Sequence, residues 1–161
     1  MVIFDDDEIG RLIGVPKVWE RKGELPSLRR KAGHVESEAR LTAEGGFVFR
    51  VLVRRSADNK VSFSAILMVQ VPGSTRWFRH LRYNGTHWHR NQIEGNRYRG
   101  FHIHKATERY QAAGLNEDGY AEVTDRHSDC DGAVRCLKKD ANLPVASRGD
   151  PNQLGLGETL E

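Results

Sequence analysis

Cysteine is scarce in this sequence of 161 residues. Its two cysteines, Cys130 and Cys136, lie six positions apart in a segment whose apolar residues recur with a helical period. Side chains six positions apart point to different faces of a helix, so these thiols cannot easily form a disulfide. A small secreted domain held together by disulfides is therefore excluded, and we expect both cysteines to be reduced.

Long apolar stretches are also missing. No run approaches the roughly 18 apolar residues of a membrane-spanning helix. The first residues, Met1 to Glu8, are acidic, whereas a signal peptide is basic and then apolar. The sequence contains no glycine-rich phosphate-binding loop, no nucleophile elbow and no Cys-x-x-Cys pair. We therefore expect a cytoplasmic protein without membrane contact, outside the enzyme classes that those motifs define.

Acidic residues are few in one block of the chain, from Arg76 to Tyr110. This block has eight Lys or Arg residues and two acidic ones, Glu94 and Glu108, whereas the part after it has five basic and ten acidic residues. A cationic segment of this kind attracts partners that carry phosphate. The alternative is a solvated strand whose charge faces the acidic C-terminal part of the same chain.

The length fits a single domain, and the apolar pattern changes from a helical period to a period of two along it. Residues 5–13 favour a short helix, because Ile9, Leu12 and Ile13 share a face behind an acidic first turn. Residues 17–33 have no clear period and are interpreted as an ordered loop. Alternating residues then predict strands over 35–43, 47–53, 61–69 and 76–83, an end of this meander at Asn84-Gly85, and a last short strand over 101–105.

The C-terminal part returns to helical patterns. Residues 106–113 and 129–140 favour helices, and 119–123 are extended. We therefore predict an α+β fold: an antiparallel four- to five-stranded meander sheet with an N-terminal helix and a C-terminal helix packed on one face. Residues 1–143 form the domain, and 144–161 form a flexible acidic C-terminal tail.

Histidines are concentrated in the cationic block. Five of the seven lie within 25 residues: His80 and two pairs, His87-Trp88-His89 and His102-Ile103-His104. In an extended strand, the period of two places both members of a pair on one face, about 6 to 7 Å apart. We expect the two pairs to form a site, the alternative being the polar surface of two exposed strands.

One chemistry that uses such a set is the cleavage of RNA without a metal. Histidine suits both proton-transfer steps, because its pKa of about 6.5 lies near working pH. Arginine suits the binding of phosphate oxygens, because its planar guanidinium binds them in a bidentate manner. In this interpretation His87 and His102 transfer protons. His89 and His104 orient these two side chains or act as alternative proton-transfer groups. The phosphate ligands are Arg82, Arg90, Arg97, Arg99 and Lys105.

Metal binding is the second interpretation. Neutral imidazoles are common metal ligands, and a zinc ion fits three or four of His87, His89, His102 and His104. Carboxylates are scarce in the block, however, and its arginines would repel a divalent cation, so we predict no cofactor and keep zinc as the alternative. The two-histidine phosphoesterases match less well, because their second position is Ser or Thr where this chain has His89 or His104.

A nucleic-acid-binding module without catalysis is the third interpretation. Aromatic residues alternate with the arginines, which is the composition of a stacking surface on a sheet. Alternating aromatics are often core residues, so we expect about half of them to be buried. The residues concerned are Trp77, Phe78, Tyr83, Trp88, Tyr98, Phe101 and Tyr110.

The segment from Leu81 to Asn91, followed by Phe101-His102-Ile103-His104 and Gly119-Tyr120-Ala121, resembles a family of small, functionally uncharacterised proteins from bacteria and prophages. Those proteins similarly have an acidic N-terminal helix that ends near a Pro-Lys step, here Pro16-Lys17, and a short C-terminal helix. The resemblance covers roughly residues 5–143. It implies no particular activity.

The turn Asn84-Gly85 followed by His87-Trp88-His89-Arg90 is also similar to the TumE-type toxins of toxin–antitoxin pairs. This resemblance implies a RelE-like ribonuclease with a basic concave face, and an antitoxin or other protein as partner. We predict a metal-independent endoribonuclease of toxin or mobile-element type that acts on RNA. The alternatives are a binding module, a histidine-ligated metal protein, and a phage-type inhibitor that binds another protein.

Overall fold

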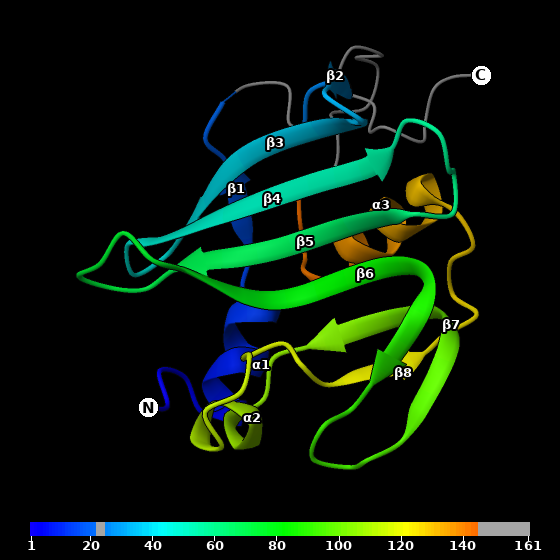
Figure 1. The fold of residues 1–161 in the computed structure, drawn as a ribbon. Coiled ribbons are helices and arrows are strands. Elements are labelled where there is room, and N and C mark those ends of the chain that lie inside the picture. The colour runs from blue at the N-terminus through cyan, green and yellow to red at the C-terminus, as the bar shows by residue number, and fades with distance from the viewer. Residues whose placement is uncertain (22–24, 145–161) are drawn as a thin grey trace.

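The computed structural model describes residues 1–21 and 25–144 (Figure 1). It is an α+β fold built on one antiparallel sheet of eight strands, in the order β1-β3-β4-β5-β6-β7-β8, with β2 paired to β3. The helices are α1 (Asp6–Gly14), α2 (Glu108–Ala112) and α3 (Cys130–Asp140). The strands are β1 (Lys17–Trp19), β2 (Arg29–Lys31), β3 (His34–Ala43), β4 (Phe47–Ser56), β5 (Phe63–Gln70), β6 (Trp77–Arg90), β7 (Arg97–Lys105) and β8 (Ala121–Val123).

One face of the sheet forms the hydrophobic core. Alternate residues of β4 and β5, such as Val51, Val53 and Leu67, are buried together with Leu12 of α1 and Leu137 of α3. Helix α3 contacts β5 and β6, and Figure 1 shows it behind these strands. The predicted α+β class, N-terminal helix and C-terminal helix on one face of a meander are therefore confirmed.

The predicted number of strands is wrong. Residues 17–33, interpreted as a loop, contain β1 and β2, and both pair with β3. Strands of three residues are too short to show a period, which is why the pattern does not reveal them. Of the predicted flexible tail, 144–161, all but Pro144 lies outside the described residues.

The predicted end of the meander at Asn84-Gly85 is also wrong, because β6 continues to Arg90 and pairs with β7 from Arg97 onward. The pairing of β6 with β7 shifts between Asn84 and His87, so the Asn-Gly step marks a bulge inside a strand. A Cβ atom at Gly85 would lie only 1.8 Å from the backbone oxygen of Val61. Glycine therefore allows β6 to bend closely past the connection between β4 and β5.

The state of the cysteines and the absence of membrane-spanning helices are also predicted from the sequence. Cys130 and Cys136 are both free, in agreement with the expected absence of a disulfide. Within residues 1–21 and 25–144, no helix has the length and apolar character needed to cross a membrane.

His80 lies in the core rather than with the other histidines of the block. It is fully buried, and its ring centroid lies 5.6 Å from that of Phe4 and 5.1 Å from that of Phe78. Burial, with a smaller contribution from the charge of Lys17, lowers the pKa of His80 to about 3. The folded protein therefore keeps this ring neutral at a pH where an unfolded chain protonates it.

This difference predicts a loss of stability in mild acid. Above pH 6.5 the ring is neutral in both states, and as the pH falls below 6.5 only the unfolded state binds the proton. His80 should therefore reduce the free energy of unfolding by about 2 kcal/mol between pH 7 and pH 5. The free energy of unfolding is measured in urea at the two pH values. His80→Leu should lack the loss of about 2 kcal/mol that we attribute to His80. His34→Gln, a change at a partly exposed histidine, should keep it. An equal loss in all three proteins would contradict the prediction.

Candidate functional site

The structure brings the two histidine pairs together on one face of neighbouring strands. His87 and His89 belong to β6, and His102 and His104 belong to β7. His89 stands opposite Tyr98, and every second residue from there along β7 shares its face. The pairing shifts at the bulge in β6, and the rings of His87 and His89 lie beside those of the pair on β7.

Three of these histidines form a compact cluster, which we call the histidine site: His89, His102 and His104. Their ring centroids are separated by 4.8 Å for His89 and His104, 5.0 Å for His102 and His104, and 5.5 Å for His89 and His102. One nitrogen of each ring lies within 4.8 Å of one nitrogen of each other ring. Zinc bonds of about 2.1 Å in a tetrahedral site place nitrogens about 3.4 Å apart, so a small closure of the rings satisfies that geometry.

Each ring of the histidine site is oriented by a hydrogen bond to an oxygen atom. His102 Nδ1 lies 2.8 Å from the Gly100 carbonyl, and His104 Nδ1 lies 2.7 Å from the Asp118 carbonyl. His89 Nε2 lies 2.8 Å from Asn91 Oδ1. Since these oxygens only accept, the three nitrogens donate, and the second nitrogen of each ring keeps its lone pair.

The second nitrogens are little used by the protein itself. Within the described part of the chain, His104 Nε2 is buried and has no hydrogen-bond partner. His102 Nε2 has one long contact, 3.4 Å from Asn84 Nδ2. A buried polar atom without a partner is costly, so these lone pairs are suited to a ligand that binds between the rings.

Burial keeps two of the rings neutral. His102 and His104 are 0% and 2% exposed, respectively. Burial, with a smaller contribution from the charge of Arg82, lowers the pKa of His102 to about 4 and that of His104 to about 2. Metal ions bind the neutral imidazole, so these ligands need not lose a proton first.

A buried carboxylate balances the nearest arginine. Asp118 is 1% exposed, and its oxygens lie 3.1 Å from Arg82 Nε and 3.4 Å from Arg79 Nε. The same residue holds His104 through its backbone carbonyl. The expected repulsion of a cation by the arginines of the block is therefore reduced at this point, because the charge of Arg82 is paired.

A cavity of about 390 Å³ opens beside the histidine site. His89 and His104 line it together with Arg82, Asp118 and the exposed His87. The ring of His87 also lies beside His102, with centroids 4.6 Å apart. Two of the three candidate ligands therefore lie in the wall of this cavity.

The five predicted phosphate ligands do not share one site. Arg82 and Arg90 line the histidine cavity. Arg97, Arg99 and Lys105 alternate along β7 with the residues of the histidine face and point to the other side of the strand. Lys105 lines a different cavity, and the Arg97 guanidinium lies 4.4 Å from the centroid of the Trp88 ring.

Two polar residues of the cationic block complete the site. The Asn91 side chain binds His89 and is itself fixed by two hydrogen bonds with the backbone of Ala121, each of 2.9 Å. The buried hydroxyl of Tyr98 has no partner among the described residues, and its ring lies beside those of His89 and His102. The sequence places Asn91 and Tyr98 between the histidine pairs, but it does not indicate which contacts they make.

Comparison with protein-family models, with curated proteins and with solved structures finds no match to this chain.

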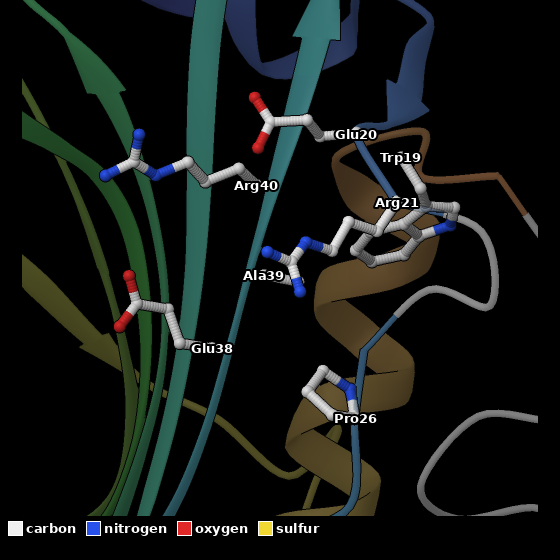
Figure 2. A pocket seen from close by; sticks show the side chains of 7 residues that line it. All are labelled: Trp19, Glu20, Arg21, Pro26, Glu38, Ala39 and Arg40. Carbon is white, nitrogen blue, oxygen red and sulfur yellow. The ribbon is translucent and has the colours of Figure 1, made fainter.

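A larger cavity, of about 550 Å³, lies at the edge of the sheet near β1 and β3 (Figure 2). Among the described residues, its lining combines two acidic residues and two arginines with Trp19, Pro26 and Ala39, without a histidine or cysteine. The charged residues are Glu20, Arg21, Glu38 and Arg40. The histidine site is therefore the better candidate for chemistry, although its cavity is smaller.

Proposed function

We propose that this protein binds a divalent transition-metal ion of the zinc class through His89, His102 and His104, and that this centre is hydrolytic. Two observations together carry the proposal: each ring donates to a fixed oxygen through one nitrogen, and one nitrogen of each ring lies within 4.8 Å of one nitrogen of each other ring. Zinc-binding histidines are typically held in this way by oxygen acceptors behind them. Three histidines with an open fourth position are the ligand set of a class of catalytic zinc sites.

The residues around the cavity suit hydrolysis of a phosphate ester. A zinc ion supplies Lewis acidity and lowers the pKa of bound water toward 7. Arg82 lines the cavity and is able to hold an anionic oxygen. His87 is exposed beside His102 and is placed to take up or give a proton.

Zinc content tests the metal site directly. After incubation with zinc and dialysis, we expect about one zinc ion per chain in the wild type, because three histidines are sufficient ligands. His89→Ala and His104→Ala should retain almost none. His34→Ala is the matched control, since it removes a histidine on β3, and it should bind zinc like the wild type. Equal zinc content in all four proteins would refute the assignment of the ligands.

One observation favours a second candidate function, the metal-free cleavage of RNA. The exposed His87 and the buried, neutral His102 lie side by side, and Arg82 is close enough to lower the pKa of both. Two histidines next to an arginine provide a base, an acid and a phosphate ligand without any ion.

A single assay separates the two candidates. Labelled RNA is incubated with the protein from pH 5 to pH 9, either with a chelator or with added zinc. Cleavage that needs zinc supports the hydrolytic metal centre, and cleavage that persists in chelator and disappears in His87→Ala supports the metal-free mechanism. Intact RNA under every condition would exclude RNA cleavage by either route.

A further inference from the structure

A second cavity meets the histidine cavity at His87. It has a volume of about 300 Å³. It lies beside the bulge of β6, where β3 and β5 begin and β4 ends. We call it the arginine cavity, because Arg54 and Arg55 line it together with His34. His87 is part of the lining of both cavities, so a ligand in one lies next to the other.

The arginine cavity carries positive charge that the protein only partly neutralises. None of the residues described as lining it is acidic. Arg54 and Arg55 are consecutive residues of β4, so their side chains leave the sheet on opposite faces, Arg54 with Ser64 and Arg55 with Phe63. Arg54 forms an ion pair with Glu36, with Nε at 3.8 Å, and Glu36 also pairs with Lys31 and His34. One carboxylate thus serves three basic side chains, and the Arg54 guanidinium has donors left for an anion.

Neutral donors complete the cavity. Ser56, Ser62 and Ser64 line it, and of these Ser64 already donates its hydroxyl hydrogen to Asn84. The oxygen of Ser56 accepts hydrogen bonds from the backbone nitrogens of Asp58 and Asn59, so its own hydrogen is directed elsewhere. Guanidinium and hydroxyl groups together match the several acceptor oxygens of a phosphate.

A row of polar side chains joins the arginine cavity to the histidine site. The antiparallel register places Arg54 opposite Ser64, Ser64 opposite Asn84, and Asn84 opposite His102, so these four residues share one face of the sheet. Ser64 Oγ donates to Asn84 Oδ1 at 2.8 Å, and Asn84 Nδ2 lies 3.4 Å from His102 Nε2. The row therefore leads across two strands from an arginine to a candidate metal ligand.

We propose that the arginine cavity is a phosphate subsite that holds one phosphate of a nucleic-acid strand whose neighbouring phosphodiester enters the histidine cavity. The role of that neighbouring group rests on the proposed function, whereas binding of phosphate by Arg54 does not. A repeating polyanion is the ligand that fills two adjacent anion-binding cavities at once. An acidic peptide is favoured less, because its carboxylates have fewer oxygens to offer the serine hydroxyls.

Binding of a labelled 12-nucleotide RNA, and of the DNA strand of the same sequence, tests this subsite. Fluorescence anisotropy is measured over a series of salt concentrations with the full chain. We expect about a tenfold loss of affinity in Arg54→Gln, which changes a half-exposed residue. The dependence on salt should also be smaller, because each lost phosphate contact lowers the slope by about 0.7 for a single strand. Arg135→Gln, on the exposed side of α3, is the control of equal charge.

The outcomes distinguish this proposal from the metal site. Zinc content is measured on the same samples, and the arginine variants should keep the zinc that His89→Ala loses. If Arg54→Gln binds RNA and DNA as Arg135→Gln does, with an unchanged salt slope, the subsite is refuted even where zinc binds. If no protein binds zinc but the arginine effect remains, the subsite stands and the metal centre fails. Absence of binding to both strands, with binding of an oligoglutamate peptide instead, would assign the cavity to an acidic protein.

Discussion

Replacing Gly85 with alanine should destabilise the protein by about 3 kcal/mol and weaken its binding of zinc. The new Cβ would lie 1.8 Å from the oxygen of Val61 and 2.8 Å from its carbonyl carbon, and both atoms belong to the backbone. The bulge therefore has to move away from the connection between β4 and β5. Thr86 N donates to the same Val61 oxygen at 3.0 Å, so this movement also breaks a hydrogen bond.

The effect on zinc follows from where the bulge lies. Gly85 stands between the part of β6 that pairs with β5 and the part that carries His89, so a shift there moves His89 relative to the two ligands on β7. Thermal unfolding and zinc titration measure the two effects. Gly10→Ala is the matched control, because nothing lies within 4 Å of its new Cβ and the position is helical. It should stabilise the protein by up to about 1 kcal/mol. A Gly85→Ala protein as stable as the wild type would contradict the packing argument.

The central strands were predictable because burial on one face repeats every second residue. In β4, Phe49, Val51 and Val53 are buried, and the intervening residues are more exposed. The continuation of β6 was not predictable in the same way. An Asn-Gly step is the usual signal of a tight hairpin turn. In this bulge the glycine is needed instead because a backbone oxygen lies where a Cβ atom would be. Only the approach of Val61 distinguishes the two.

The histidines of the candidate site were predictable from the sequence, but the groups that orient them and balance the nearby charge were not. The period of two correctly indicates that His102 and His104 share a face, because both lie in one regular strand. The acceptors behind them are the carbonyls of Gly100 and Asp118, and every residue has a carbonyl. The pairing of Arg82 with Asp118 joins residues far apart in the sequence, so composition of the cationic block alone overstates its charge.

Zinc should raise the free energy of unfolding by about 4 kcal/mol when its free concentration is a thousand times the dissociation constant. The ion binds a cluster that exists only in the folded chain, because β6 and β7 bring His89 to His102 and His104. The free energy of zinc binding therefore stabilises the folded state relative to the unfolded chain. Denaturant unfolding with zinc and with chelator measures the difference.

The His89→Ala variant makes this test specific. His89 is the least buried of the three rings, and its hydrogen bond is to the Asn91 side chain, so its removal should cost little stability without zinc. The stabilisation by zinc, in contrast, should disappear almost completely, because two histidines are a weaker ligand set than three. His34→Ala should keep the full stabilisation. Equal stabilisation of His89→Ala and the wild type would place the bound zinc elsewhere, while the loss of this gain in His89→Ala alone would locate the ion between β6 and β7.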